Sequence, residues 1–110
     1  MRTHAAKRIE IIIEAPLLRR LSRLLDEAGA PGYTVLPVLA GSGVSGPWTR
    51  DGQVSAAGGM CTVLIVTSPE KAEALMEAAF EVVEPHIGIV SMTDCQVVRP
   101  QLFDRSSGEG

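Results

Sequence analysis

The clearest alternation of apolar and charged residues lies at residues 8–14, where Ile9, Ile11 and Ile13 alternate with charged side chains. A period of two is typical of a strand with one buried face, because successive side chains point to opposite sides of a sheet. Ile12 adds an apolar residue to the second face. We therefore expect a strand at 8–14 whose two faces are both partly apolar.

Two segments have apolar residues at helical spacing. The first begins near Pro16 and ends before Gly29, residue types that favour the first turn of a helix and the position just after its end. The second follows Ser68, a good N-cap residue, and begins at Pro69. The stripes expected to face the core are Leu17, Leu18, Leu21, Leu24, Leu25 and Ala28 in the first helix, and Ala72, Leu75, Met76, Ala79, Phe80 and Val83 in the second.

Further segments rich in β-branched and apolar residues predict the remaining strands. Residues 33–39 contain Pro37, which favours an edge strand or a bulge because proline cannot donate to a ladder. Residues 60–67 are apolar almost throughout, which is typical of a strand buried on both faces. Residues 87–93 predict a fourth strand, and a turn at Asp94 would separate it from a short fifth strand at 95–99.

Residues 41–59 interrupt this pattern with a polar segment of Gly, Ser, Pro, Thr, Arg, Asp and Gln that has neither helical nor strand period. A loop of this length inside a compact domain is usually functional or mobile. It contains Trp48, the one tryptophan of the chain, close to Arg50. Both residue types are common at interaction hot spots, so the pair is a candidate partner contact; a tryptophan that folds back onto its own subunit is the alternative.

The order of these elements predicts an α+β fold, a ferredoxin-like βαββαβ sandwich with one additional strand. Right-handed crossovers place both helices on one face of a single sheet. The other face keeps the apolar residues of the strands at 8–14 and 60–67. Self-association would cover that face.

Composition narrows the class of protein. A chain of 110 residues with 45% apolar and 21% charged residues predicts one domain over residues 1–110. The formal charge of -3 argues against nucleic acid as a partner. No apolar run approaches the roughly 20 residues that span a bilayer, so we expect a cytoplasmic protein without membrane insertion. Cys61 and Cys95 lie in strand-like segments, where free thiols usually act as buried apolar fillers.

Candidate chemistry is sparse. Gly41 to Gly46 match G-x-G-x-x-G after a strand, but no helix pattern follows, so the dinucleotide fingerprint lacks its context. The segment could still form an anion-binding nest, or serve only as a flexible hinge. The two histidines, His4 and His86, belong to no cluster with metal-ligand spacing. With no catalytic constellation either, we expect neither a metal site nor an enzyme.

Several of these segments resemble the PII signal-transduction superfamily. Residues 9–14 and 17–21 look like its first strand and helix, and residues 28–35 resemble its "GxTGxTV" turn. Residues 41–59 stand at the position of the family's T-loop, residues 86–90 at that of its B-loop, and residues 97–99 at its C-terminal strand, before a tail at 100–110. The resemblance implies a homotrimer that binds adenine nucleotides in clefts between subunits and contacts its target through the T-loop.

The resemblance also implies which residues bind the nucleotide. Gly41, Ser42 and Gly43 would shape the base of the T-loop, Gly88 and Ile89 would offer backbone contacts, and Arg99 would contact phosphate. A single arginine neutralises a short phosphate tail better than a long one. We therefore expect ADP or AMP to bind at least as well as ATP, with no covalent cofactor.

Departures from the nitrogen-regulatory members favour the inorganic-carbon branch of the superfamily. The segment 41–59 has no tyrosine to modify, and residues 84–88 lack the basic character of the family's B-loop. The resemblance is to carboxysome-associated PII-like proteins, which implies bicarbonate as a second ligand and a transporter or a carboxysome-related protein as the target. The alternative is a trimeric, divalent-metal-responsive ferredoxin-like protein that binds no nucleotide.

Overall fold

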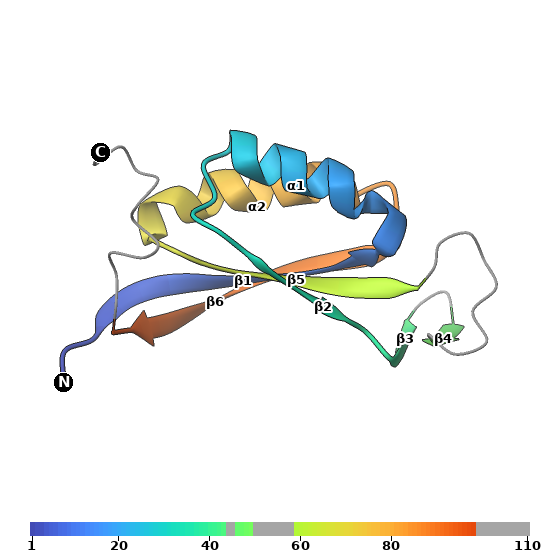
Figure 1. Ribbon diagram of the computed structural model, residues 1–110, viewed down its shortest axis with the longest axis horizontal. Helices are drawn as coiled ribbons and strands as arrows, with labels where there is room; N and C mark the ends of the chain where they lie inside the picture. Colours follow the sequence, from blue (N-terminus) through green and yellow to red (C-terminus); the bar gives the residue numbers. More distant parts are fainter. Residues whose placement is uncertain (44–45, 50–58, 99–110) are drawn as a thin grey trace.

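The computed structural model describes residues 1–43, 46–49 and 59–98 (Figure 1). Arg50 and Arg99 lie outside the described residues. In chain order the elements are β1 (His4–Glu14), the 3-10 turn η1 (Ala15–Leu17), α1 (Leu18–Glu27), β2 (Thr34–Pro37), β3 (Ala40–Gly43), β4 (Gly46–Thr49), β5 (Met60–Thr67), α2 (Pro69–Val83) and β6 (Gly88–Val97).

The main sheet is antiparallel and has the order β2-β5-β1-β6, with β3 and β4 forming a separate two-stranded ladder. Both helices lie on one face of the main sheet (Figure 1). This arrangement confirms the predicted ferredoxin-like fold. It also confirms that the strand containing Pro37 is an edge strand, where the missing N–H does not interrupt a central ladder.

The core lies between the helices and the sheet. Alternate residues of β1 and β5 point into it, and cross-strand pairing aligns Ile9 with Ile65 and Ile11 with Val63. These four side chains are fully buried. Leu21 and Leu25 from α1 and Leu75, Ala79 and Val82 from α2 complete the cluster.

Local signals set the helix boundaries as the sequence predicts. Pro16 lies in the 3-10 turn that leads into α1, and Gly29 follows the helix with a φ of 91°, a left-handed conformation that favours glycine. The Nζ of Lys71 in α2 donates to the carbonyl oxygen of Gly29 at 3.2 Å, so the turn after α1 is tied to the first turn of α2. Ser68 stands at the N-cap position of α2, before Pro69.

The predicted break at Asp94 is wrong, because β6 is one continuous strand from Gly88 to Val97. Asp94 pairs with Lys7 of β1 in the ladder, and its carboxylate forms a salt bridge with the Lys7 ammonium group. Asp94, a charged residue on an edge strand, thus has an oppositely charged partner on the neighbouring strand. That partner is distant in sequence, so a turn was the better local interpretation of Asp94.

The prediction that residues 41–59 contain no strand is also wrong. Residues 40–43 and 46–49 form a short antiparallel ladder in which Gly41 pairs with Trp48 and Ser42 with Pro47. This ladder depends on backbone pairing and carries no alternation of apolar and polar residues, which is the signal that sequence analysis can detect.

The predicted stripe of α2 is wrong at one position, because Phe80 is 55% exposed. At 3.6 residues per turn, Phe80 lies about 140° around the helix from Leu75, whereas Val82 lies within about 20° of it. Val82 is fully buried and takes the place in the core. Met76 packs at the margin of the core.

Candidate functional site

A groove of about 640 Å³ opens on the face of the sheet that the helices leave bare. Its lining residues come from β1, from β5, from the turn before β2 with the first residue of that strand, and from the end of β6. They are Arg8, Pro31, Gly32, Tyr33, Thr34, Leu64, Val66, Gln96, Val97 and Val98. Small-molecule sites typically have volumes of about 300–1,000 Å³ and mostly apolar walls with a few polar groups. Its size and lining suit a nucleotide-sized ligand.

Arg8 is the charged residue among the described residues that line this groove. Its guanidinium Nη1 lies 3.9 Å from the Glu10 carboxylate oxygen Oε1, beyond hydrogen-bond distance. Its side chain is 42% exposed. The guanidinium can therefore donate to an anionic group of a ligand held in the groove.

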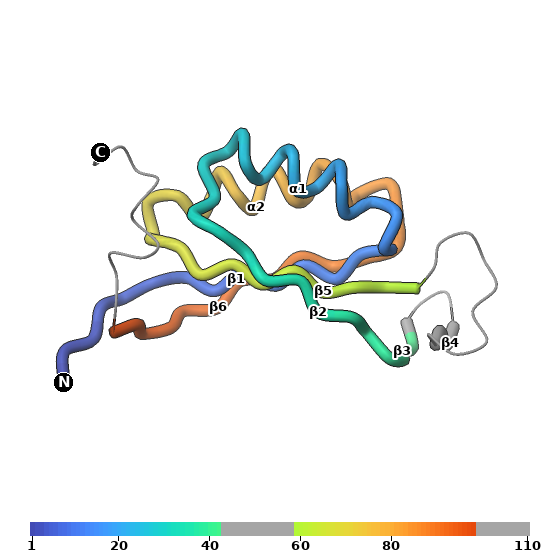
Figure 2. Tube along the Cα trace, in the orientation of Figure 1, coloured from blue at the N-terminus to red at the C-terminus, as the bar shows by residue number. Residues whose placement is uncertain are grey.

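Five of the six predicted nucleotide-binding residues follow β2 or begin β6, at the opposite end of the sheet from the groove (Figure 2). One row of cross-strand pairs runs from Pro37 to Cys61, then to Ile13 and then to Gly88. Gly41, Ser42 and Gly43 follow the β2 edge of this row, and Gly88 and Ile89 begin β6 at the other edge. Three strand spacings, about 14 Å, separate the two edges.

Arg99 follows Val98, which lines the groove. The 10 residues of β6, which begins at Gly88, are extended, so roughly 33 Å of strand separates Gly88 from Val98. A single subunit therefore places Gly41 to Gly43 and the pair Gly88 and Ile89 at opposite edges of the sheet.

The backbone of Gly41, Ser42 and Gly43 is extended and paired with β4. A nest needs successive N–H groups in a turned conformation that aims them at one point, so these three residues do not form the anion-binding nest that the sequence suggested. The next two residues lie outside the described part. Trp48 stands on β4 opposite Gly41.

Most residues of the groove have no sequence signal that marks them as ligand contacts. Pro31, Gly32 and Thr34 belong to the turn that carries the family resemblance, and that turn was the available signal for a ligand site there. Arg8, Leu64 and Val66 look like ordinary strand residues in sequence. They line the groove because pairing brings β5 beside β1, with Val66 opposite Arg8.

The described residues contain no cluster of three or more potential metal ligands among His, Cys, Asp and Glu. His86 approaches Glu14, with 3.9 Å between Nδ1 and Oε1. Burial raises the pKa of the Cys61 thiol, which favours its neutral form. Within the described segments, no helix has the length and apolar character needed to cross a bilayer.

Residues 6–102 match the model of the family described as Nitrogen regulatory protein P-II. This chain belongs to the P-II family. Among solved structures, it is similar to CPII of Thiomonas intermedia K12 bound to ADP, AMP and bicarbonate, with 29% identity over 93% of this chain and 96% of that chain and a TM-score of 0.84. The same protein bound to ADP and bicarbonate gives 30% identity over 93% and 97% of the two chains and a TM-score of 0.79.

A putative PII-like signalling protein from Thermus thermophilus matches with 27% identity over 94% of this chain and 99% of that chain, at a TM-score of 0.74. No curated protein matches the sequence. The similarities to CPII are consistent with membership of the CPII branch of the P-II family, which confirms the predicted resemblance. P-II proteins are typically homotrimers and generally non-enzymatic signalling proteins.

Proposed function

We propose that this P-II family protein is a non-enzymatic regulator that binds ADP or AMP, together with bicarbonate, in clefts between the subunits of a homotrimer. The observation that carries the proposal is the similarity over 93% of the chain to a CPII structure bound to ADP, AMP and bicarbonate. The groove on the bare sheet face supports it, because its volume and apolar lining suit an adenine nucleotide.

The division of the predicted site supports a position between subunits. The groove lies at one end of the sheet, and Gly41 to Gly43 and Gly88 to Ile89 lie at the other. A trimer can place the groove of one subunit against the Gly88 end of the next. One complete site would then take residues from two chains, and the apolar face of the sheet would be covered at the same time.

Arg99 would contact phosphate in this arrangement, since it directly follows the groove residue Val98. A guanidinium matches phosphate oxygens in bidentate fashion. The described residues add one charged group, Arg8, to the groove. This limited positive charge favours the shorter phosphate tails of AMP and ADP.

The output would come from the T-loop, residues 41–59, with Trp48 and Arg50 as contacts to a transporter or a carboxysome-related protein. Bicarbonate binding would connect this output to inorganic-carbon uptake or fixation in the cytoplasm. Bicarbonate and nucleotide that favour the same T-loop conformation must raise each other's affinity by the same factor.

Calorimetric titration of ADP into the protein, with bicarbonate or with an equal concentration of chloride, tests the proposal. We expect ADP to bind in both buffers and more tightly with bicarbonate, and Trp48 fluorescence to respond to the pair beyond the sum of the separate responses. Absence of adenylate binding, with heat on addition of a divalent cation, would instead support the metal-responsive alternative.

Two arginine variants locate the phosphate. Arg99→Ala should weaken ADP binding by about 1.5–3 kcal/mol, the range for a hydrogen bond to a charged group. Arg23→Ala removes the same charge from the exposed side of α1 and should leave ADP affinity unchanged. Equal affinities for the two variants would place the phosphate elsewhere.

A further inference from the structure

A second hollow, of about 540 Å³, lies on the flank of the molecule between α2 and β6. Its apolar floor consists of Met76 and Phe80 from α2 and Val90 from β6. Phe80 is the largest of the three and is 55% exposed. Met92 lies two residues further along the same face of β6 and is 40% exposed, so the apolar surface continues along the strand.

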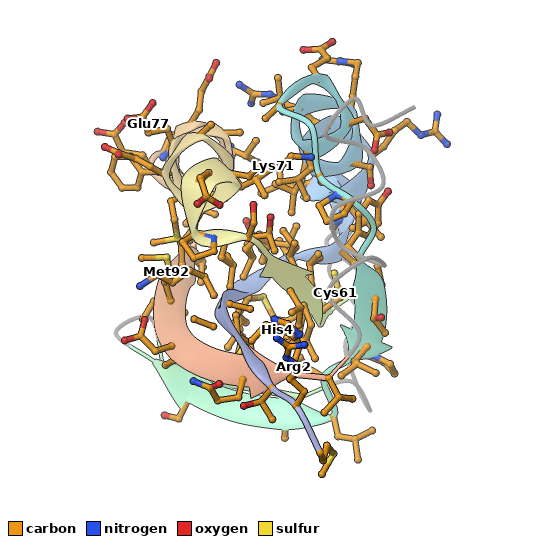
Figure 3. All side chains as sticks on the ribbon, turned by 90° about the vertical axis from the view of Figure 1, so that its left-hand side faces the viewer. Arg2, His4, Cys61, Lys71, Glu77 and Met92 are labelled. Atoms are coloured by element: carbon orange, nitrogen blue, oxygen red, sulfur yellow. The ribbon has the colours of Figure 1, made fainter. Side chains whose placement is uncertain are left out.

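The rim of this hollow is acidic. Glu73, Glu77, Glu81 and Glu84 line it, and all four are exposed. Figure 3 places Glu77 and Met92 on the same side of the molecule, with the carboxylate on the helix above and the thioether on the strand below. Acidic side chains therefore border one edge of an exposed apolar surface.

Among the described residues, the ion pairs of Lys7 with Asp94 and of Arg8 with Glu10, and the approach of His86 to Glu14, involve other groups than these carboxylates. Glu73, Glu77 and Glu81 follow one another at i, i+4 spacing, where like charges destabilise a helix. A cationic partner would remove this repulsion. An apolar partner surface would cover Phe80 at the same time.

We propose that the hollow between α2 and β6 is a docking groove for a cationic amphipathic helix of another protein. Such a helix would place apolar side chains on Phe80, Met76 and Val90, and lysines or arginines against the glutamates. This is the helix-in-groove mode of recognition, in which anchors at i and i+4 enter an apolar groove. The segment from Glu73 to Glu84 spans roughly 16 Å, the length of about three helical turns of a partner.

The docking groove is a different hollow from the groove proposed to hold the nucleotide, and the two share no lining residue. Its residues Glu84 and Val90 lie on either side of Gly88 and Ile89 in the chain. The nucleotide groove opens on the bare face of the sheet, whereas the docking groove lies between a helix and the edge strand β6. The proposal therefore does not depend on ADP or bicarbonate binding, and it adds a contact surface besides the T-loop.

Binding of a defined peptide tests the proposal. The probe is a fluorescein-labelled helical peptide of leucine and lysine, about three to four turns long, with leucines on one face. Its controls are a scrambled peptide of the same composition and an amphipathic peptide of leucine and glutamate. We expect saturable binding of the first peptide by fluorescence anisotropy, weakened at high salt, and at least tenfold weaker binding of both controls.

Variants of the protein assign the binding to the groove. Phe80→Ala should lower the affinity for the peptide of leucine and lysine at least tenfold. The double change Glu77→Gln with Glu81→Gln should lower the same affinity at least threefold. Glu70→Gln is the matched control, because Glu70 is exposed on α2 outside the groove and should leave the affinity unchanged. The glutamine changes are on the surface, so they also test the groove should Phe80→Ala disturb folding.

Three results would overturn the proposal. Equal binding of the scrambled peptide would reduce the interaction to general attraction between opposite charges. Unchanged affinity in the glutamine double variant would separate the binding from the acidic rim. A Phe80→Ala protein that remains folded but loses its oligomeric state in sedimentation would make the groove a contact between copies of this chain.

Discussion

Gly88 packs so closely against the backbone of Ile12 that a Cβ atom at position 88 would lie 2.5 Å from the Ile12 carbonyl oxygen. The same atom would lie 3.2 Å from Cγ1 of Val83. Real Cβ atoms do not approach backbone so closely, so any larger residue would force β6 away from β1 where the two strands begin to pair. Gly88 therefore has a packing role besides its proposed contact with nucleotide.

Gly88→Ala should lower the free energy of unfolding by about 1–3 kcal/mol, the usual cost of overpacking a close contact. Urea unfolding without ligand measures it. Gly32→Ala is the control, because nothing lies within 4 Å of its Cβ position and its backbone carries no positive φ. That variant should be unchanged or slightly more stable, since alanine restricts the unfolded chain. A Gly88→Ala protein as stable as the control would contradict the close contact.

Ile11 and Ile12 are neighbours in the chain that face opposite sides of the sheet. Ile11 is fully buried beneath the helices, so Ile11→Ala should cost about 2–5 kcal/mol of unfolding free energy. Ile12 lies on the bare face, opposite Thr62 and Ile89 in the neighbouring strands. Ile12→Lys should therefore weaken the homotrimer, measured by sedimentation, and leave helix content by circular dichroism unchanged. A trimer that survives Ile12→Lys at micromolar protein would argue that another surface holds the subunits.

Cys61 should make the stability depend on alkaline pH. Burial raises the pKa of its thiol in the folded protein, so the fold binds this proton more tightly than the unfolded chain does. The stability that the protonated Cys61 thiol contributes is fully present below the pKa of about 8.5 that the thiol has in the unfolded chain. It is lost as the pH rises through the higher pKa of the thiol in the folded protein. Urea unfolding across this range should show a smaller decline for Cys61→Ala than for the unmodified protein. A Cys61→Ala protein that keeps the full decline would show that another group causes it.

Thr67 is fully buried at the end of β5, and its hydroxyl has no hydrogen-bond partner among the described residues. Valine has nearly the same shape and no polar atom to desolvate, so Thr67→Val should raise the free energy of unfolding by about 1 kcal/mol. Thr93→Val, at an exposed position on β6, should change it by less than about 0.5 kcal/mol. If Thr67→Val lowers the stability, the hydroxyl must have a partner in the folded protein.

Elements with local signals could be predicted from the amino-acid sequence. The alternation of Ile9, Ile11 and Ile13 predicted a strand, and Pro16, Gly29 and the Ser68–Pro69 pair marked the helix boundaries. These signals act within a few residues of the position they specify, through fixed φ angles, capping and the period of side chains. Their order along the chain was then enough to predict the βαββαβ topology.

Features that depend on partners distant in sequence could not be predicted before the strands and helices were seen to pack together. Asp94 continues a strand because Lys7 pairs with it from 87 residues away, and Phe80 is left exposed because Val82 fills the core position. The groove combines Arg8, the turn before β2, Leu64 and the end of β6, and sheet pairing is what makes them neighbours. A local pattern records which face of an element is apolar. Which residues lie beside one another across the sheet is fixed only when the strands pair.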